Sequence, residues 1–169
     1  LSGLMTAPDL AIETASVKSK LMTASYAGTV KLGENPVLDG TFKADLADAG
    51  EVAKALGVKL DAPQLFKKVS ATGTLKGPAD KLALTGISAS HEGPDFSATY
   101  KGAVGLAEPM TLDGAVTASL PRAGDFARAL KIEIPGQNAV EKIDVAARLN
   151  GPITTLALSE IDLKHSGAL

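Results

Sequence analysis

The amino-acid sequence predicts a mainly β protein: an elongated antiparallel β-repeat array, forming a curved sheet or groove, with one short helix per repeat of about 74 residues. Three observations predict this class. Residues 26–93 align without a gap with residues 100–167, and 25 of the 68 aligned positions are identical. Long stretches alternate between apolar and polar residues, and one helical segment interrupts the alternation in each copy. Such a duplication indicates a supersecondary unit stacked on itself, with its function on a repeated surface.

The sequence predicts that the chain begins within a unit. The Leu-Ala-Ile run at 10–12 matches Leu-Ala-Leu at 82–84 after a slip of two residues relative to the main alignment. We therefore predict that residues 1–25 are the tail of a preceding repeat, residues 26–99 the first full repeat and residues 100–169 the second. The whole would be one continuous fragment of a longer protein.

Composition excludes several classes of protein. The formal net charge is only −2 and the lysines are scattered singly, which argues against binding to nucleic acid. No apolar run approaches the roughly 18 residues that a membrane-spanning helix needs. The absence of Cys excludes disulfides and thiolate metal sites. With 45% apolar residues, the chain can still bury a sizeable core.

Each repeat is predicted to begin with a long β-hairpin. In the second copy, residues 96–106 are apolar or small on one parity and mostly polar on the other. After a turn at Glu108-Pro109, the alternation resumes over 110–120. The first copy repeats this pattern over 26–32 and 38–46. Each hairpin should therefore have one apolar face.

A short helix is predicted next in each copy, at about 49–57 and 123–131. An acidic residue, Glu51 or Asp125, lies in its first turn, where the helix dipole favours negative charge. Apolar residues follow at i, i+4 spacing on one face. Gly57 is a plausible C-terminal stop in the first copy. A helix this short needs a sheet to pack on.

Two further strands are predicted to complete each unit. Alternation resumes over 69–75 and 143–149, and Gly-Pro then turns the chain in both copies. In the last strand the apolar parity changes near Thr85-Gly86 and near Ser159-Glu160. A β-bulge explains this change, because one extra residue keeps the apolar set on one face. Bulges at fixed positions predict a twisted, curved sheet with an apolar concave side.

The order of these segments resembles a known family. The alternating hairpin is followed by the Ala-Gly-Glu-Val-Ala-Lys-Ala-Leu-Gly helix at 49–57, the Val-Ser-Ala-Thr-Gly-Thr-Leu-Lys-Gly strand at 69–77 and the Leu-Ala-Leu strand at 82–84. This arrangement, over essentially the whole chain, resembles the AsmA family of Gram-negative envelope proteins. The resemblance implies a periplasmic β-groove that passes lipids towards the outer membrane, in a parent protein anchored in the inner membrane.

Residues that could carry chemistry are few. His91 and His165 occupy equivalent positions one full unit apart and lack a partner at ligand spacing, so we expect surface or strand-end histidines and no metal site. Asp39 and Asp113 fall on the polar parity of strands with no His or Cys to complete a nucleophilic set. Phosphate-loop and nucleophile-elbow motifs are absent. We expect neither an enzyme nor a cofactor.

The remaining candidate site is the apolar parity of the strands. The candidate lipid-facing residues are Val30, Leu32, Leu38, Phe42, Leu82, Leu84, Phe96, Tyr100, Val104, Leu112, Val116, Leu156 and Leu158. One interpretation is an ordinary closed core, in which the sheet folds over on itself. The other is an open trough for acyl chains. Small residues at the same parity favour the trough, because they leave room between its walls.

The sequence thus leaves two hypotheses for function. The first is a non-enzymatic periplasmic groove module that guides lipids between the inner and outer membranes, with acyl chains as its partners. The second is a structural or assembly module with a closed β-core, whose sheet edges recruit other envelope proteins by strand addition.

Overall fold

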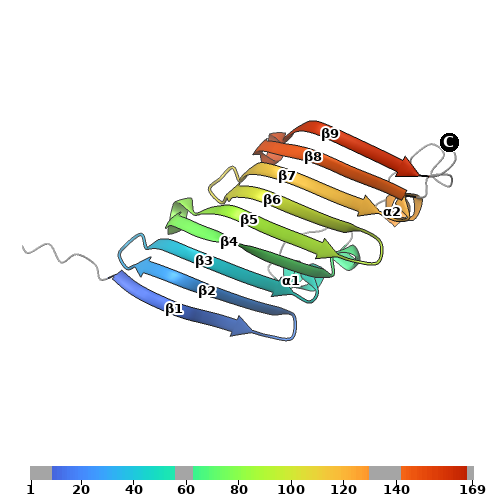
Figure 1. Ribbon diagram of the computed structural model, residues 1–169. Helices are drawn as coiled ribbons and strands as arrows, with labels where there is room; N and C mark the ends of the chain where they lie inside the picture. Colours follow the sequence, from blue (N-terminus) through green and yellow to red (C-terminus); the bar gives the residue numbers. More distant parts are fainter. Residues whose placement is uncertain (1–8, 56–62, 130–141, 167–169) are drawn as a thin grey trace, which may run out of the picture.

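The computed structural model describes residues 9–55, 63–129 and 142–166, which form one curved, unclosed antiparallel sheet of nine strands (Figure 1). Each strand pairs with the next strand in the sequence, so the sheet order is β1 to β9 without a crossover. This confirms the predicted mainly β array. Within the described residues the sheet is a single layer, because the strands neither close into a barrel nor fold back on themselves.

The two copies contain the same four strands and the same α-helix in the same order. An outer strand, β1 (Asp9–Lys18), precedes them. The first copy comprises β2 (Met22–Lys31), β3 (Val37–Leu46), α1 (Ala49–Ala55), η1 (Pro63–Leu65), β4 (Lys68–Pro78), η2 (Ala79–Lys81) and β5 (Ala83–Glu92). The second comprises β6 (Ser97–Gly105), β7 (Thr111–Leu120), α2 (Ala123–Ala129), β8 (Lys142–Pro152), η3 (Ile153–Thr155) and β9 (Ala157–Ser166). Both predicted helices are present, while the predicted stop at Gly57 lies outside the described residues.

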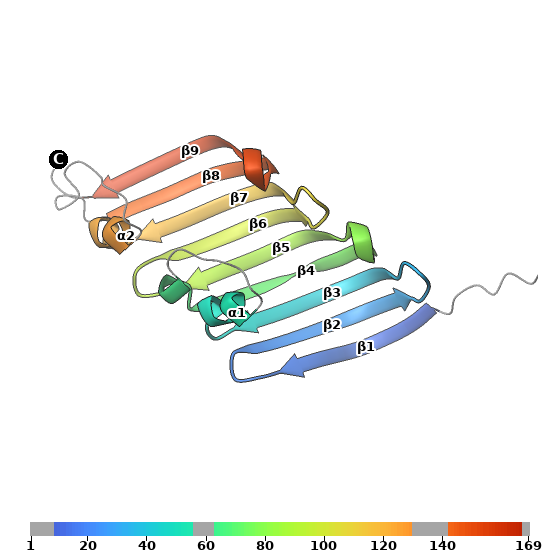
Figure 2. The same ribbon diagram turned by 180° about the vertical axis from the view of Figure 1, so that it is seen from behind.

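The helices α1 and α2 lie on one face of the sheet, near one end of the strands (Figure 2). Asp48 caps α1, since its Oδ1 accepts a hydrogen bond from the Glu51 N–H at 3.1 Å. The Lys67 ammonium lies 2.7 Å from Asp48 Oδ2, and this hydrogen bond is the main cause that lowers the pKa of the Asp48 carboxyl. No helix among the described residues is long and apolar enough to cross a membrane.

The predicted bulges are present in both copies. The β5–β6 register shifts between Leu84 and Ile87, and the β8–β9 register shifts opposite the Ser159–Asp162 segment. Gly86 has φ +56° and Glu160, its counterpart, has φ +51°. This left-handed conformation suits Gly, which has no Cβ to clash with the backbone, and is strained for Glu.

The strand registers show how β1 corresponds to β5, and they correct the sequence alignment of residues 10–12 with 82–84. Leu10 faces Val30 as Leu84 faces Val104, and Ala15 faces Tyr26 as Ala89 faces Tyr100. The strands therefore match at the main offset of 74 residues, without the slip of two that the Leu-Ala-Ile run suggested. The bulge is displaced instead: in β1 it lies between Ile12 and Ala15. Pairing with the neighbouring strand sets the register here, rather than the local sequence.

We predict that Glu160→Gly raises the free energy of unfolding by about 1 kcal/mol, because it relieves a left-handed residue that carries a Cβ. Urea denaturation would measure the change. Gly86→Ala is the matched control, since a Cβ there meets no atom within 4 Å and only the backbone conformation is penalised. It should destabilise the protein by a similar amount. A loss of stability in Glu160→Gly would contradict the prediction.

Candidate functional site

One face of the sheet is apolar across all nine strands. Directly opposed residues in antiparallel strands point to the same face. Val30 faces Leu38, Leu84 faces Val104, and Val104 faces Leu112. Because the bulges restore the parity, the apolar residues at both ends of β5 and β9 remain on this face. We call it the apolar face.

The structure places most of the candidate residues on strands of this face. Partly exposed strand residues are Val30, Leu38, Phe42, Leu84, Tyr100, Val104, Leu112 and Val116. Leu158 lies on the outer strand β9 and is 57% exposed. Leu32, Leu82 and Leu156 lie in the connections next to strand ends.

Phe96 is a correction to the predicted lipid-facing set. It is 8% exposed and packs in a cluster with Leu65, Phe66 and Phe126. Its ring centroid lies 5.7 Å from that of Phe66 and 5.0 Å from that of Phe126, both in edge-on geometry. We call this group the aromatic cluster. It attaches α2 and the segment after η1 to one end of the apolar face, so Phe96 is a packing residue.

In two equivalent places on the apolar face, a tyrosine ring lies across two glycines, a feature that the sequence interpretation missed. We call each of these a tyrosine platform, and the two together form the floor of the apolar face. An added Cβ at Gly28 or Gly40 would lie within 3 Å of the Tyr26 hydroxyl oxygen, so this ring lies across both glycines. The Tyr26 hydroxyl donates to the Thr29 carbonyl at 2.9 Å. The repeated Tyr-x-Gly motif is the signal that could have revealed the platforms.

The second platform has the same construction. The Tyr100 ring lies across Gly102 and Gly114, and its hydroxyl donates to the Ala103 carbonyl at 2.7 Å. Burial raises the pKa of the Tyr100 hydroxyl above its usual value. The expectation that small residues leave empty room is therefore wrong at these glycines, because tyrosine rings cover them. The covered floor presents flat aromatic surface, with the hydroxyl donors already engaged.

His91 is a second correction. The expectation was a surface or strand-end histidine, and His91 lies at the end of β5. It is not at the surface, because it is only 7% exposed and its ring centroid lies 4.2 Å from that of Phe96. Neither ring nitrogen has a hydrogen-bond partner among the described residues. Burial lowers the pKa of the imidazole, so the neutral form is favoured in the folded protein. Its counterpart His165 is exposed on β9.

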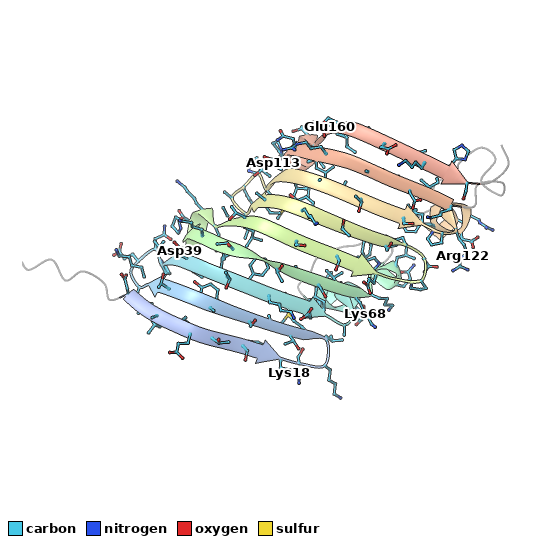
Figure 3. The ribbon with its side chains drawn as sticks, in the orientation of Figure 1. Lys18, Asp39, Lys68, Asp113, Arg122 and Glu160 are labelled. Atoms are coloured by element: carbon cyan, nitrogen blue, oxygen red, sulfur yellow. The ribbon has the colours of Figure 1, made fainter. Side chains whose placement is uncertain are left out.

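The opposite face is polar, with many Ser and Thr residues and several exposed ion pairs. Asp39 lies 3.5 Å from Lys76, and Asp113 lies 3.2 Å from Arg148. Figure 3 shows Asp39 and Asp113 near the same end of their strands, on equivalent hairpins. Such exposed pairs contribute little to stability, and they are solvated strand positions, as the sequence predicted. The described residues hold no group of three His, Cys, Asp or Glu that could bind a metal ion.

Two shallow depressions of about 280 and 290 Å³ lie mainly on the polar face. They occupy equivalent places in the two repeats, and Ser97 and Ser119 line one as Thr23 and Asp45 line the other. Their hydroxyls and carboxylates are largely paired within the sheet: the Ser70 hydroxyl donates to Asp45 at 2.8 Å. The apolar face remains the candidate site.

Comparisons with protein-family models, with curated proteins and with solved structures gave no match. The candidate site therefore rests on the geometry of this chain.

Proposed function

We propose that this chain is a non-enzymatic groove module of an AsmA-like envelope protein in the periplasm, and that its apolar face binds lipid acyl chains in transit between the inner and outer membranes. The parent protein would be anchored in the inner membrane. One observation carries the proposal: an apolar face runs unbroken across nine strands, and the unclosed sheet leaves it partly exposed. Contiguous exposed apolar surface of this extent is typical of interaction sites.

The chemistry of the face favours chains over headgroups. Burying a methylene group stabilises a complex by about 0.8 kcal/mol without any directional requirement, so a chain can move along such a face. Both tyrosine hydroxyls on the floor already donate to carbonyls of their own strands. The floor thus offers no free donor there for a phosphate or sugar. We expect binding to depend on chain length more than on the headgroup.

The alternative hypothesis, a structural or assembly module, has less support. It required a closed β-core, whereas the described residues form a single unclosed layer. A role in assembly would then depend on the outer strands alone.

The test compares two neighbouring positions on β7 whose side chains point to opposite faces. Val116 faces Tyr100 and Ala147 on the apolar face, while Ala115 faces Lys101 and Arg148 on the polar face. Val116→Asp places an ion in the chain path, and we expect it to weaken binding of a fatty acid with a fluorophore at its chain end by about tenfold or more. Ala115→Asp should leave binding unchanged.

Thermal melting and mass spectrometry of co-purifying lipids complete the experiment. If Val116→Asp melts normally and binding of the probe is unchanged, the apolar face is rejected as the lipid path. Should Val116→Asp fail to fold, Val116→Thr introduces a hydroxyl in nearly the same volume and keeps the strand preference. Binding that is lost equally in Ala115→Asp would also count against the proposal.

A further inference from the structure

His91 occupies a position on the apolar face that the repeat can fill with an apolar residue. On β5 it lies on the same side as Ile87, because alternate residues of a strand point to one face. In the preceding unit the equivalent residue is Val17, which faces Ala24 as His91 faces Ala98. Since valine meets the packing requirement of this position, the ionisable ring adds a property that the fold itself does not need.

The imidazole of His91 is enclosed by two aromatic rings and a glycine. Its centroid lies 4.2 Å from that of Phe96 and 6.0 Å from that of Phe66. An added Cβ at Gly93, in the turn between β5 and β6, would lie 2.8 Å from the His91 Nε2. Neither ring nitrogen has a hydrogen-bond partner among the described residues. The neutral ring leaves one donor and one acceptor unpaired, whereas the protonated ring would leave two donors and a charge.

The surroundings of the ring offer no compensation for that charge. Burial is the main cause that lowers the pKa of His91, and only the Lys68 backbone opposes it. The charged residues of the surrounding elements are exposed on the polar face, as Lys68 and Glu92 are, or paired with each other, as are Lys67 with Asp48, Asp95 with Arg122, and Asp125 with Arg128. A protonated ring must therefore reach water, and one of the two aromatic rings against it has to move.

Phe66 is held less firmly than Phe96. The Phe96 carbonyl accepts a hydrogen bond from the Gly93 N–H at 3.1 Å, and the Phe96 side chain is buried. Phe66 is partly exposed and lies between η1 and β4, outside the strands. Its carbonyl accepts a hydrogen bond from the Gly50 N–H of α1 at 2.8 Å. Displacement of Phe66 would therefore move α1 and η1 with it.

We propose that His91 is an acid-sensitive switch between the two repeats: protonation of its ring detaches Phe66, with η1 and α1, from the aromatic cluster and uncovers that end of the apolar face. The helices α1 and α2 lie along the same end of the strands (Figure 2). The contacts of Phe96 with Phe66 and with Phe126 join the α1 segment to α2. Detachment would also expose Leu65, which is now 6% exposed. The inference does not depend on what the apolar face binds.

The direction of the pH effect follows from burial. An imidazole in water has a pKa of about 6.5, and burial lowers the pKa of His91 below this value. The closed form therefore binds fewer protons than the open form. It is fully favoured above about pH 6.5, and the ratio of closed to open molecules falls by up to about tenfold per pH unit below that value. Asp48 stays ionised in this range, because its pKa is lowered as well.

Hydrogen exchange of the Gly50 amide, followed by NMR, tests the switch. After correction for the intrinsic pH dependence of exchange, we expect its protection to fall about tenfold or more from about pH 7.5 to about pH 5. The control is the Leu106 amide, which donates to the Leu82 carbonyl at the other end of these strands and should keep its protection. His91→Val introduces the residue of the preceding unit, and in this variant the Gly50 protection should be equal at both pH values.

A second measurement needs no variant. The chain has two His, and NMR titration distinguishes the buried His91 from the exposed His165. We expect His91 to titrate at a lower pH than a free imidazole, and titration at the ordinary value would overturn the proposal. Equal losses of protection at Gly50 and Leu106 would show global unfolding by acid and reject a local switch. An unchanged pH dependence in His91→Val would assign the effect to another group.

Discussion

Phe96→Ala is expected to lower the free energy of unfolding by about 3–5 kcal/mol. Phe96 is 8% exposed and lies at the centre of the aromatic cluster, in contact with both Phe66 and Phe126. Its removal leaves a cavity where three segments meet. Urea denaturation followed by circular dichroism would measure the loss.

The matched control for this prediction is Phe42→Ala. Phe42 is on the same face of the sheet, but it is partly exposed and its ring lies on Gly73. Its truncation should cost about 1–2 kcal/mol, since less surface is buried. Phe96→Ala should also reduce helical signal, because α2 has only seven residues and is attached through Phe126. Equal losses in the two variants would contradict the central role of Phe96.

Gly114→Ala is expected to cost about 1–3 kcal/mol through overpacking at the second tyrosine platform. An added Cβ would lie 2.5 Å from the Lys101 carbonyl oxygen, 2.8 Å from the Gly102 Cα and 2.9 Å from a Tyr100 ring carbon. Two of these atoms belong to the backbone of β6 and cannot move away easily. We therefore expect the Tyr100 ring to be displaced.

Near-ultraviolet circular dichroism should report that displacement, since the chain has two Tyr and no Trp. Gly33→Ala is the control, because a Cβ at Gly33 meets nothing within 4 Å. It should leave both stability and the tyrosine signal unchanged. A stable Gly114→Ala protein with an unaltered tyrosine signal would show that the ring does not lie across Gly114.

Local patterns in the sequence were sufficient to predict the elements of each repeat. The alternation over 96–106 and 110–120 has the period of a strand, and the change of parity near Gly86 has few explanations other than a bulge. The duplication then doubles every observation, which is why both helices and both bulges were predicted close to their observed positions. These features depend on neighbours in the chain, so the sequence by itself determined them.

The tertiary structure decided what covers the apolar parity. Phe66, Phe96 and Phe126 are 30 residues apart in succession, and tertiary contacts bring them together, with Phe66 and Phe96 against His91. That contact makes Phe96 a packing residue and buries His91 at its strand end. In the same way, cross-strand register places each tyrosine ring over a glycine of the next strand. Apolar alternation shows which side of a strand avoids water, but contacts between distant segments determine what lies against that side.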